Sequence, residues 1–281
     1  MIGRSSLRPL IWALLAGSAG LGLAIAAPAP SAQLVQNNAG VTEVDVELAL
    51  AVDISYSMDP DEQELQREGY IHALTSNEFL RALKDGAHGK IAVTYFEWAN
   101  NNERRVIVPW RLIDGPEAAD AFVADIARAP YRRASRTSIS GALEFAVQLF
   151  ENSGYKGIRR VIDVSGDGPN NNGPPVTIVR DEALAKGFVI NGLPVMVKQQ
   201  YSSGMDIAQL DMYYEDCVIG GPGAFVIPIK DRSQFRDATR TKLVQEIAAV
   251  PPEPRVVPAA SSAPRVSCLV GETIWQQRWG N

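Results

Sequence analysis

The stretch Asp53-Ile54-Ser55-Tyr56-Ser57 closes an apolar run that begins at residue 44. The run starts with alternating apolar and polar residues and ends as continuous apolar sequence, which predicts a strand that becomes buried on both faces. An Asp-Pro-Asp-Glu sequence follows at residues 59–62, and proline and acidic residues are typical of the first turn of a helix. The stretch therefore lies on a turn between a buried strand and a helix.

At this turn, Asp53, Ser55 and Ser57 can place one carboxylate and two hydroxyls around a single point. Only oxygen ligands are offered, which suits a hard cation such as Mg²⁺, with Mn²⁺ or Ca²⁺ as alternatives. One carboxylate is too few for tight binding, so the site needs ligands from elsewhere in the chain. The alternative interpretation is that these side chains cap the following helix.

Two later stretches offer further oxygen ligands. Thr137 stands just ahead of an amphipathic helical pattern over residues 141–150, and Asp167 follows the buried strand pattern of residues 159–165. In an open α/β sheet, loops at the carboxyl ends of the strands share one edge, and ligands bind there. Together with the first turn, these loops offer five side chains that carry oxygen.

In order, spacing and flanking pattern, the three loops resemble the von Willebrand factor type A domain and its metal-ion-dependent adhesion site. The resemblance covers residues 44–247. It is closest to an exported bacterial branch of that superfamily with no assigned function, because of the sequence over residues 213–225 and the triplet Phe96-Glu97-Trp98. It implies a doubly wound α/β fold with a mostly parallel six-stranded sheet, helices on both faces and one antiparallel edge strand.

The resemblance also implies the metal ligands: Asp53, Ser55 and Ser57 match the first motif, Thr137 the second loop and Asp167 the third. It further implies a protein partner that supplies a carboxylate to an open position on the metal. The sequence departs from the family just before the threonine. Many type A domains have glycines there, whereas this chain has Ser135-Arg136, and Ser138 is a nearby alternative ligand.

The remaining elements follow from hydrophobic periodicity and turn residues. The predicted strands cover residues 44–52, 90–98, 105–112, 159–165 and 188–197, with a sixth inside 218–229. The predicted helices cover residues 62–83 as one long or two short helices, then 116–129, 141–150, 176–186, 206–216 and 233–250.

The two ends of the chain lie outside this domain. Residues 1–32 carry a basic head, an apolar middle and Ala-x-Ala sequences, which predict a secretory signal peptide; an uncleaved membrane anchor is the alternative. Residues 33–43 form a linker, residues 44–250 the domain, and residues 251–281 a Pro-rich linker and tail. No later segment has the length and apolarity of a membrane span. We therefore expect an exported protein, periplasmic or secreted.

The net charge limits the kinds of partner, and the two cysteines bear on the cellular compartment. Without residues 1–32 the chain keeps 25 basic and 32 acidic residues, a formal charge of −7, which argues against nucleic acid as a partner. Cys217 and Cys268 are the only cysteines. In an oxidising compartment they can form a disulfide that ties the tail to the domain, or they can stay apart.

Catalytic groups are scarce. The two histidines, His72 and His88, are distant in sequence from the metal loops, and no Ser-His-Asp order, Cys-His pair or zinc motif is present. The leading hypothesis is a non-enzymatic, metal-dependent protein-binding module. The alternatives are a metal-dependent hydrolase and a structural envelope protein with a vestigial metal site.

Overall fold

The computed structural model describes residues 41–197, 204–248 and 263–280. The predicted signal peptide, residues 33–40 of the predicted linker and most of the Pro-rich linker lie outside the described residues. The last two residues of the predicted linker, Thr42 and Glu43, belong to the first strand. Within the described ranges, no helix is long and apolar enough to cross a membrane.

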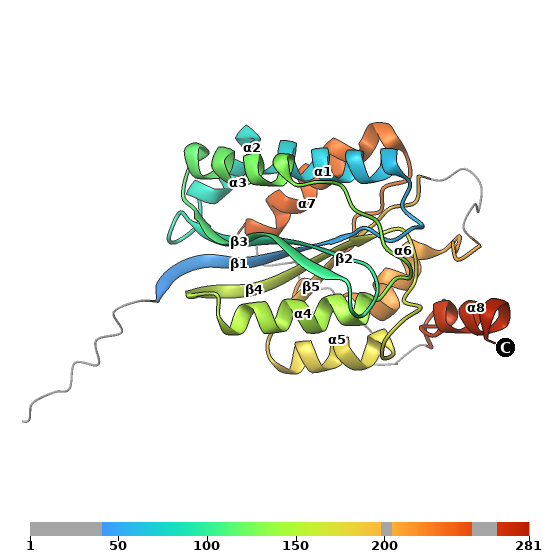
Figure 1. Cartoon of the computed structure of the whole chain (residues 1–281). Coiled ribbons are helices and arrows are strands. Elements are labelled where there is room, and N and C mark those ends of the chain that lie inside the picture. The colour runs from blue at the N-terminus through green and yellow to red at the C-terminus, as the bar shows by residue number, and fades with distance from the viewer. Residues whose placement is uncertain (1–40, 198–203, 249–262, 281) are drawn as a thin grey trace, which may run out of the picture. The chain divides into compact units, whose positions relative to one another are not determined.

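The strands form one sheet in the order β3-β2-β1-β4-β5 (Figure 1). The central strand β1 (Thr42–Asp53) pairs in parallel with β2 (Ile91–Trp98) and with β4 (Tyr155–Gly166). On the outside, β5 (Val189–Pro194) is parallel to β4, and β3 (Arg104–Ile113) is the antiparallel edge strand. The end of β1 is apolar because it has neighbouring strands on both sides and helices over both faces.

Helices cover both faces of the sheet (Figure 1). One face carries α1 (Pro60–Leu74), α2 (Asn77–Lys84), α3 (Pro116–Arg128) and α7 (Phe235–Ile247). The other face carries α4 (Ile139–Glu151), α5 (Val176–Ala185) and α6 (Leu210–Tyr213), which continues as a π-helical turn over Tyr214–Val218. The predicted helical segment 62–83 is two helices because Ser76 caps a new start, accepting a hydrogen bond from the Phe79 N–H.

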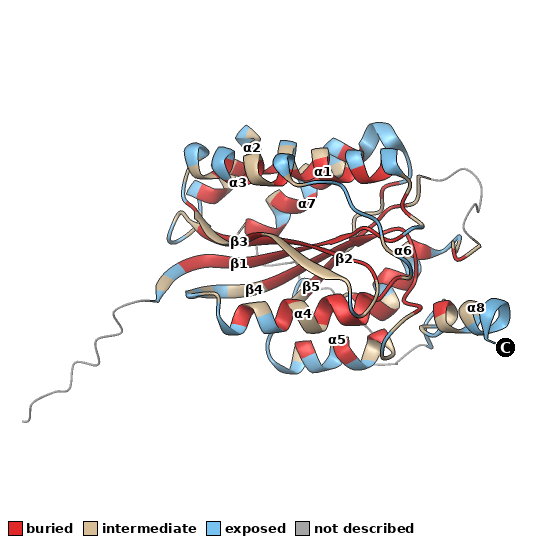
Figure 2. Ribbon diagram, viewed as in Figure 1, coloured by how far each residue is buried: buried red, intermediate tan, exposed pale blue. Residues whose placement is uncertain are grey.

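Successive side chains of β1 point to opposite faces of the sheet and contribute to two separate cores. Leu48, Leu50 and Val52 belong to the core under α1 and α7, and Ala49 and Ala51 belong to the core under α4. Figure 2 shows that β1 and β2 are buried along most of their length, whereas the edge strand β3 is mostly intermediate. Each face of β1 thus contributes a different side-chain volume, large on one side and small on the other.

The predicted sixth strand, inside residues 218–229, does not form in the described part of the chain, and the sheet there has five strands. This segment runs beside β5 and makes isolated bridges only: Gly220 with Ile190, Val226 with Gly192 and Ile229 with Val195. Pro222 and Pro228 have no backbone N–H to donate, and the turn over residues 220–223 interrupts the extended backbone. The prediction of six strands was therefore wrong by one.

A fully buried ion cluster joins α7 to the sheet. The Lys242 ammonium lies 2.5 Å from Asp163 Oδ1 on β4 and also pairs with Glu246 one turn further along α7. Tyr70 donates a hydrogen bond to Asp163 (3.2 Å), and the Asn191 amide donates one to Glu246 (3.3 Å). The cluster holds two carboxylates against one ammonium. Burial, reinforced by the neighbouring Asp163 carboxylate, raises the pKa of Glu246 to about 7.

This cluster predicts that the protein loses stability as the pH rises through neutrality. The folded state holds the Glu246 proton more tightly than the unfolded state, whose pKa is near 4.5. The stabilisation is therefore complete below pH 4.5 and is lost as the pH passes 7, by up to about 3 kcal/mol. Urea unfolding between pH 5 and pH 8 measures it. In the Glu246→Gln variant the free energy of unfolding should depend less on pH. An unchanged pH dependence would show that Glu246 is not the group that titrates.

Candidate metal site at the strand ends

The first predicted motif forms a compact turn after β1. The Asp53 carboxylate accepts a hydrogen bond from the Ser55 N–H at 2.7 Å, which fixes the turn. The hydroxyls of Ser55 and Ser57 are 2.7 Å apart, and Ser57 donates a hydrogen bond to Asp167 Oδ1 at 2.7 Å. Three of the predicted ligands thus converge with the fourth, Asp167, although 110 residues separate it from Ser57.

The alternative interpretation, that this motif caps the next helix, is wrong. The N-cap of α1 is Asp59, which accepts from the Glu62 N–H at 2.8 Å, while the Asp59 N–H donates to the Glu62 carboxylate at 2.9 Å. This reciprocal pair satisfies the start of the helix. Asp53, Ser55 and Ser57 are therefore available for another purpose.

Thr137 lies on the loop before α4, next to the loop that carries Asp167. Its N–H donates to Asn171 Oδ1 (3.0 Å), and its carbonyl accepts from the Asn171 N–H (2.8 Å). A side chain placed on Gly168 would lie 3.8 Å from the Thr137 hydroxyl. Thr137 and Asp167 are both nearly fully buried. The structure therefore places Thr137 beside the Asp167 loop but shows no hydrogen bond from its hydroxyl to the other predicted ligands.

Sequence reasoning missed the part that Asn171 plays in positioning Thr137, because residues 170–172 have the composition of an ordinary turn. Its neighbours in the turn are also engaged. Asn170 Oδ1 accepts from the Ser140 N–H (3.0 Å), and Asn172 Oδ1 accepts from the Asn101 N–H (2.9 Å). The asparagine run therefore ties the Asp167 loop to the start of α4 and to the β2–β3 hairpin.

The Ser135-Arg136 sequence, at a place where many type A domains have glycines, has a visible consequence. Arg136 has a φ of +70°, and it is the one non-glycine residue in the described ranges with a positive φ. Glycine adopts this conformation without strain, whereas other residues pay for it. The Arg136 guanidinium lies 3.5 Å from the centre of the Trp275 ring, a contact that offsets part of this cost. Ser138 caps α4 by accepting from the Gly141 N–H, so its hydroxyl is engaged at the start of that helix.

The chemistry of the cluster fits a divalent cation. Asp53 Oδ2 is buried and has no hydrogen-bond partner. Burial raises the pKa of Asp53 well above its ordinary value, and the nearby Asp167 carboxylate raises it further. A side-chain carbon on Gly166 would come within 2.8 Å of Asp53 Oδ2, so the glycine leaves room for this oxygen. A cation would satisfy the unpartnered oxygen and relieve the repulsion between the two carboxylates.

The donor set is also restrictive. No group of three or more His, Cys, Asp and Glu side chains suited to a metal occurs among the residues with described positions. A cation at this edge would therefore depend on serine and threonine hydroxyls in addition to Asp53 and Asp167. Oxygen donors with only two carboxylates favour a hard cation of the Mg²⁺ type over zinc, which prefers nitrogen and sulfur.

Neither histidine contributes to this site. His72 is in the last turn of α1, about 18 Å along the helix from Pro60. The His88 N–H donates to Asp45 Oδ1 (2.8 Å). Asp45 is close to the start of β1, so His88 lies at the amino-terminal ends of the strands, opposite to the candidate site. The candidate site has no imidazole that can serve as a general base.

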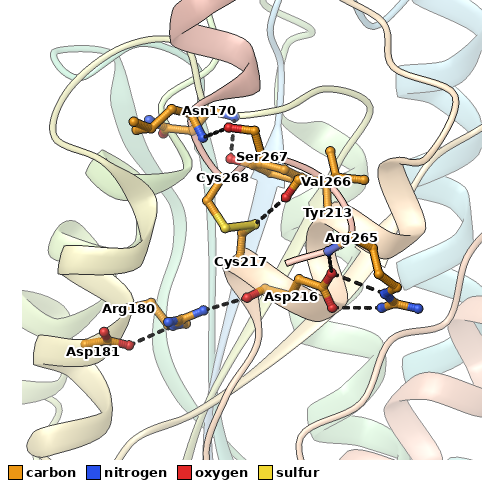
Figure 3. Close-up of a disulfide and its surroundings, with 11 residues drawn as sticks. Asn170, Arg180, Asp181, Tyr213, Asp216, Cys217, Arg265, Val266, Ser267 and Cys268 are labelled. Atoms are coloured by element: carbon orange, nitrogen blue, oxygen red, sulfur yellow. Dashed lines mark hydrogen bonds and ion pairs between the residues drawn. A yellow bond between two sulfur atoms is a disulfide. The ribbon is translucent and has the colours of Figure 1, made fainter. Parts of the chain in front are cut away.

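The tail packs back on the domain beside this site. Cys217 and Cys268 form a disulfide, and Arg265 pairs with Asp216 (2.8 Å) and Glu215 (2.5 Å), as Figure 3 shows for the disulfide and Asp216. The disulfide leads into α8 (Val270–Trp279), which lies beyond the carboxyl ends of the strands (Figure 1).

Two contacts connect α8 to the loops of the candidate site. The Asn170 amide donates to Glu272 Oε1 at 2.8 Å, and the Trp275 ring covers Arg136. Gly271 lies so close to the Asn170 carbonyl that a side-chain carbon would be 2.0 Å from it. The tail thus contacts both loops, the one that carries Thr137 and the one that carries Asp167.

A protein-family model described as "Protein of unknown function (DUF1194)" matches residues 43–251. No curated protein sequence matches the chain. The match ends before the tail, so α8 and Cys268 lie outside the matched region.

Solved structures with a similar fold include proximal thread matrix protein 1 from the mussel byssus (16% identity, TM-score 0.50) and the pilus adhesin SpaC from Lactobacillus rhamnosus GG (12%, 0.51). A von Willebrand factor type A protein from Catenulispora acidiphila has 16% identity and a TM-score of 0.49. The matches cover 75%, 76% and 73% of this chain but only 49%, 31% and 43% of those chains. At these identities the likeness concerns the α/β fold alone.

Proposed function

The chain belongs to the family described as proteins of unknown function (DUF1194), and we propose that it is a non-enzymatic module that binds a protein partner through a divalent cation. One observation carries the proposal: the buried, unpartnered Asp53 Oδ2 in a cluster made only of oxygen ligands. A buried carboxylate without a partner is costly, and a cation at this point removes the cost.

Each predicted ligand has a role in this proposal. Asp53, Ser55 and Ser57 hold the cation, and Thr137 and Asp167 complete its shell directly or through water. Mg²⁺ is the first candidate, with Mn²⁺ or Ca²⁺ as alternatives. When bound, the cation supplies an open coordination position that accepts a carboxylate of the partner. The protein's own part is to exclude water from the Asp53 side, to keep the hydroxyls oriented and to present the open side to the partner.

The disulfide and the structural neighbours support a binding role in the periplasm or outside the cell. The Cys217–Cys268 disulfide is typical of an oxidising compartment and agrees with the predicted export to the periplasm or medium. The structurally similar proteins are named as a thread matrix protein and a pilus adhesin. The lack of a histidine near the cluster weighs against the alternative of a metal-dependent hydrolase.

Titration of metal into the mature, metal-stripped protein tests the proposal. Calorimetry should show saturable binding of Mg²⁺ and Mn²⁺ at one site. At a metal concentration of 100 times the Kd, the folded state gains about 2.7 kcal/mol, so the thermal midpoint should rise by about 5–10 °C. No heat and no shift would remove the metal from the function and favour the structural alternative. Turnover of a phosphate ester that requires the metal would favour the hydrolase.

A further inference from the structure

We propose that a groove beside the loop of Asp53, Ser55 and Ser57, the metal loop, is the docking surface for an acidic peptide segment of the partner protein. The groove is lined by Tyr56, Tyr131, Arg132 and Arg133 together with Pro60, Gln63 and Glu64 of α1. The groove has a volume of about 560 Å³. The inference rests on the proposed function, since the same segment would carry the carboxylate that reaches the cation. It adds a second contact, which the arginines make with acidic residues next to that carboxylate.

The groove lies directly beside the metal loop. Tyr56, one of its walls, stands between Ser55 and Ser57 in the chain. The opposite wall runs parallel to the metal loop: the Tyr56 N–H donates to the Ala134 carbonyl (2.8 Å), and the Ala134 N–H donates to the Ile54 carbonyl (3.1 Å). The Arg133 guanidinium donates to the Tyr56 carbonyl at 2.7 Å. A peptide in this groove therefore begins its path next to the predicted ligands.

The groove is positively charged although the protein as a whole is acidic. Arg132 and Arg133 are exposed, and neither makes an ion pair with a carboxylate of the described residues. Glu64 is the one carboxylate that lines the groove. The formal charge of the whole chain is −5, so the sign of the groove is opposite to that of the chain. An acidic segment is the complementary occupant.

The tyrosines give the groove apolar surface to bury. Tyr56 is 60% exposed and Tyr131 is 53% exposed, a large fraction for aromatic side chains. The Arg67 guanidinium lies 3.9 Å from the centre of the Tyr131 ring and is itself held by the buried Glu97 at 2.6 Å. The Arg67 guanidinium, fixed by Glu97, therefore holds the Tyr131 ring in position. Exposed tyrosines next to arginines are typical of the residues that dominate protein interfaces.

On the other side of the metal site, α8 packs against the loops that carry Thr137 and Asp167, which favours the groove as the approach. Arg136, the third arginine of the same loop, is covered by Trp275 of α8. Asn170, on the Asp167 loop, is bonded to Glu272 of α8. Because the disulfide holds α8 in this place, the side of Tyr56 and of the two exposed arginines, Arg132 and Arg133, is the approach for a partner.

Fluorescence anisotropy with labelled peptides tests the inference in the full mature chain. The probe is a seven-residue peptide of alternating Gly and Glu, and its matched control replaces each Glu with Gln. In saturating Mg²⁺ the acidic peptide should bind, and the Gln peptide should bind at least tenfold more weakly. The double variant Arg132→Glu/Arg133→Glu should lower the affinity for the acidic peptide at least tenfold. The single variant Arg132→Glu keeps the hydrogen bond from Arg133 to the Tyr56 carbonyl. It should lower the peptide affinity severalfold while metal binding, measured by calorimetry, stays unchanged.

Two further variants separate a specific groove from general charge. The variant Lys84→Glu/Lys186→Glu makes the same change in net charge as the double arginine variant. Both lysines are exposed and precede β2 and β5, at the amino-terminal ends of the strands. This variant should leave peptide affinity within twofold of the unaltered protein. Glu64→Lys, in the groove itself, should strengthen peptide binding severalfold, a gain that misfolding cannot produce.

Several outcomes would overturn the inference. Absence of acidic-peptide binding at millimolar concentration with the metal bound would do so, as would equal losses in the two charge-reversal variants. Equal affinity for the Gln peptide would show that the groove does not select acidic residues. A failure of metal binding itself would instead count against the proposed function, so the two failures are distinguishable.

Discussion

The Asp53→Ala variant is expected to lose Mg²⁺ and Mn²⁺ binding, with an affinity at least about 100-fold below that of the unaltered protein. Asp53 provides one of only two carboxylates in the cluster, and its Oδ2 is the buried oxygen without a partner. Removing a charged ligand costs more than removing a group that only orients a ligand, for which losses of about 10–100-fold are usual. Calorimetric titration measures the affinity.

The same substitution should have an unusual effect on the metal-free protein. The pKa of Asp53 is raised because its charged form is poorly solvated and faces Asp167, so the carboxylate stabilises the metal-free fold little. Asp53→Asn keeps an oxygen that can accept the Ser55 N–H and removes the charge. The metal-free Asn variant should melt at the same temperature as the unaltered protein or higher, while failing to bind metal.

A matched control is available six residues later. Asp59 also carries a carboxylate near the metal loop, but it caps α1. Asp59→Ala should lower the free energy of unfolding by about 1 kcal/mol and leave metal affinity nearly unchanged. If Asp53→Ala bound Mg²⁺ as well as the unaltered protein, or if Asp59→Ala lost as much affinity, the assignment of Asp53 as a ligand would be wrong.

The second large effect concerns Lys242. Lys242→Met is expected to lower the free energy of unfolding by about 3–5 kcal/mol at pH 7, because it leaves Asp163 and Glu246 buried without a cation. The loss should shrink below pH 5, where the two carboxyls can take up protons in place of the ammonium. Urea unfolding at both pH values measures this difference.

The control for this variant is Lys84→Met, at an exposed position of α2, which should change stability by no more than about 0.5 kcal/mol. A loss of less than 1 kcal/mol for Lys242→Met would mean that water or a neighbouring group compensates the two carboxylates. Because the cluster joins α7 to β4, the result also measures how firmly this helix is attached to the sheet.

Much of the fold could be predicted from the sequence, because local patterns specify local elements. The apolar run before Asp53 predicted β1, and the period of apolar residues predicted the helices to within a few residues at most ends. The segment over residues 218–229 was the failure. Its apolar residues suited a strand, but strand formation also needs continuous pairing, which its prolines and glycine-rich turn prevent.

The candidate site could be predicted as a set of residues but not as an arrangement. Residue types and order were enough to select Asp53, Ser55, Ser57, Thr137 and Asp167. The hydrogen bond from Ser57 to Asp167 and the unpartnered oxygen of Asp53 depend on how β1 and β4 bring their ends together. Whether these residues hold a metal stays a prediction.

The sequence by itself determined the α/β class of this protein, the strand-to-helix turn at its centre and the oxygen chemistry of the loops, since these follow from residue type and period. Only the tertiary structure decided which arginines stay exposed and where the tail lies. Arg132, Arg133 and Arg136 are alike in sequence, yet Trp275 covers the third alone. The physical reason is that contacts between residues more than 100 positions apart are set by packing and by the disulfide, and no local pattern encodes them.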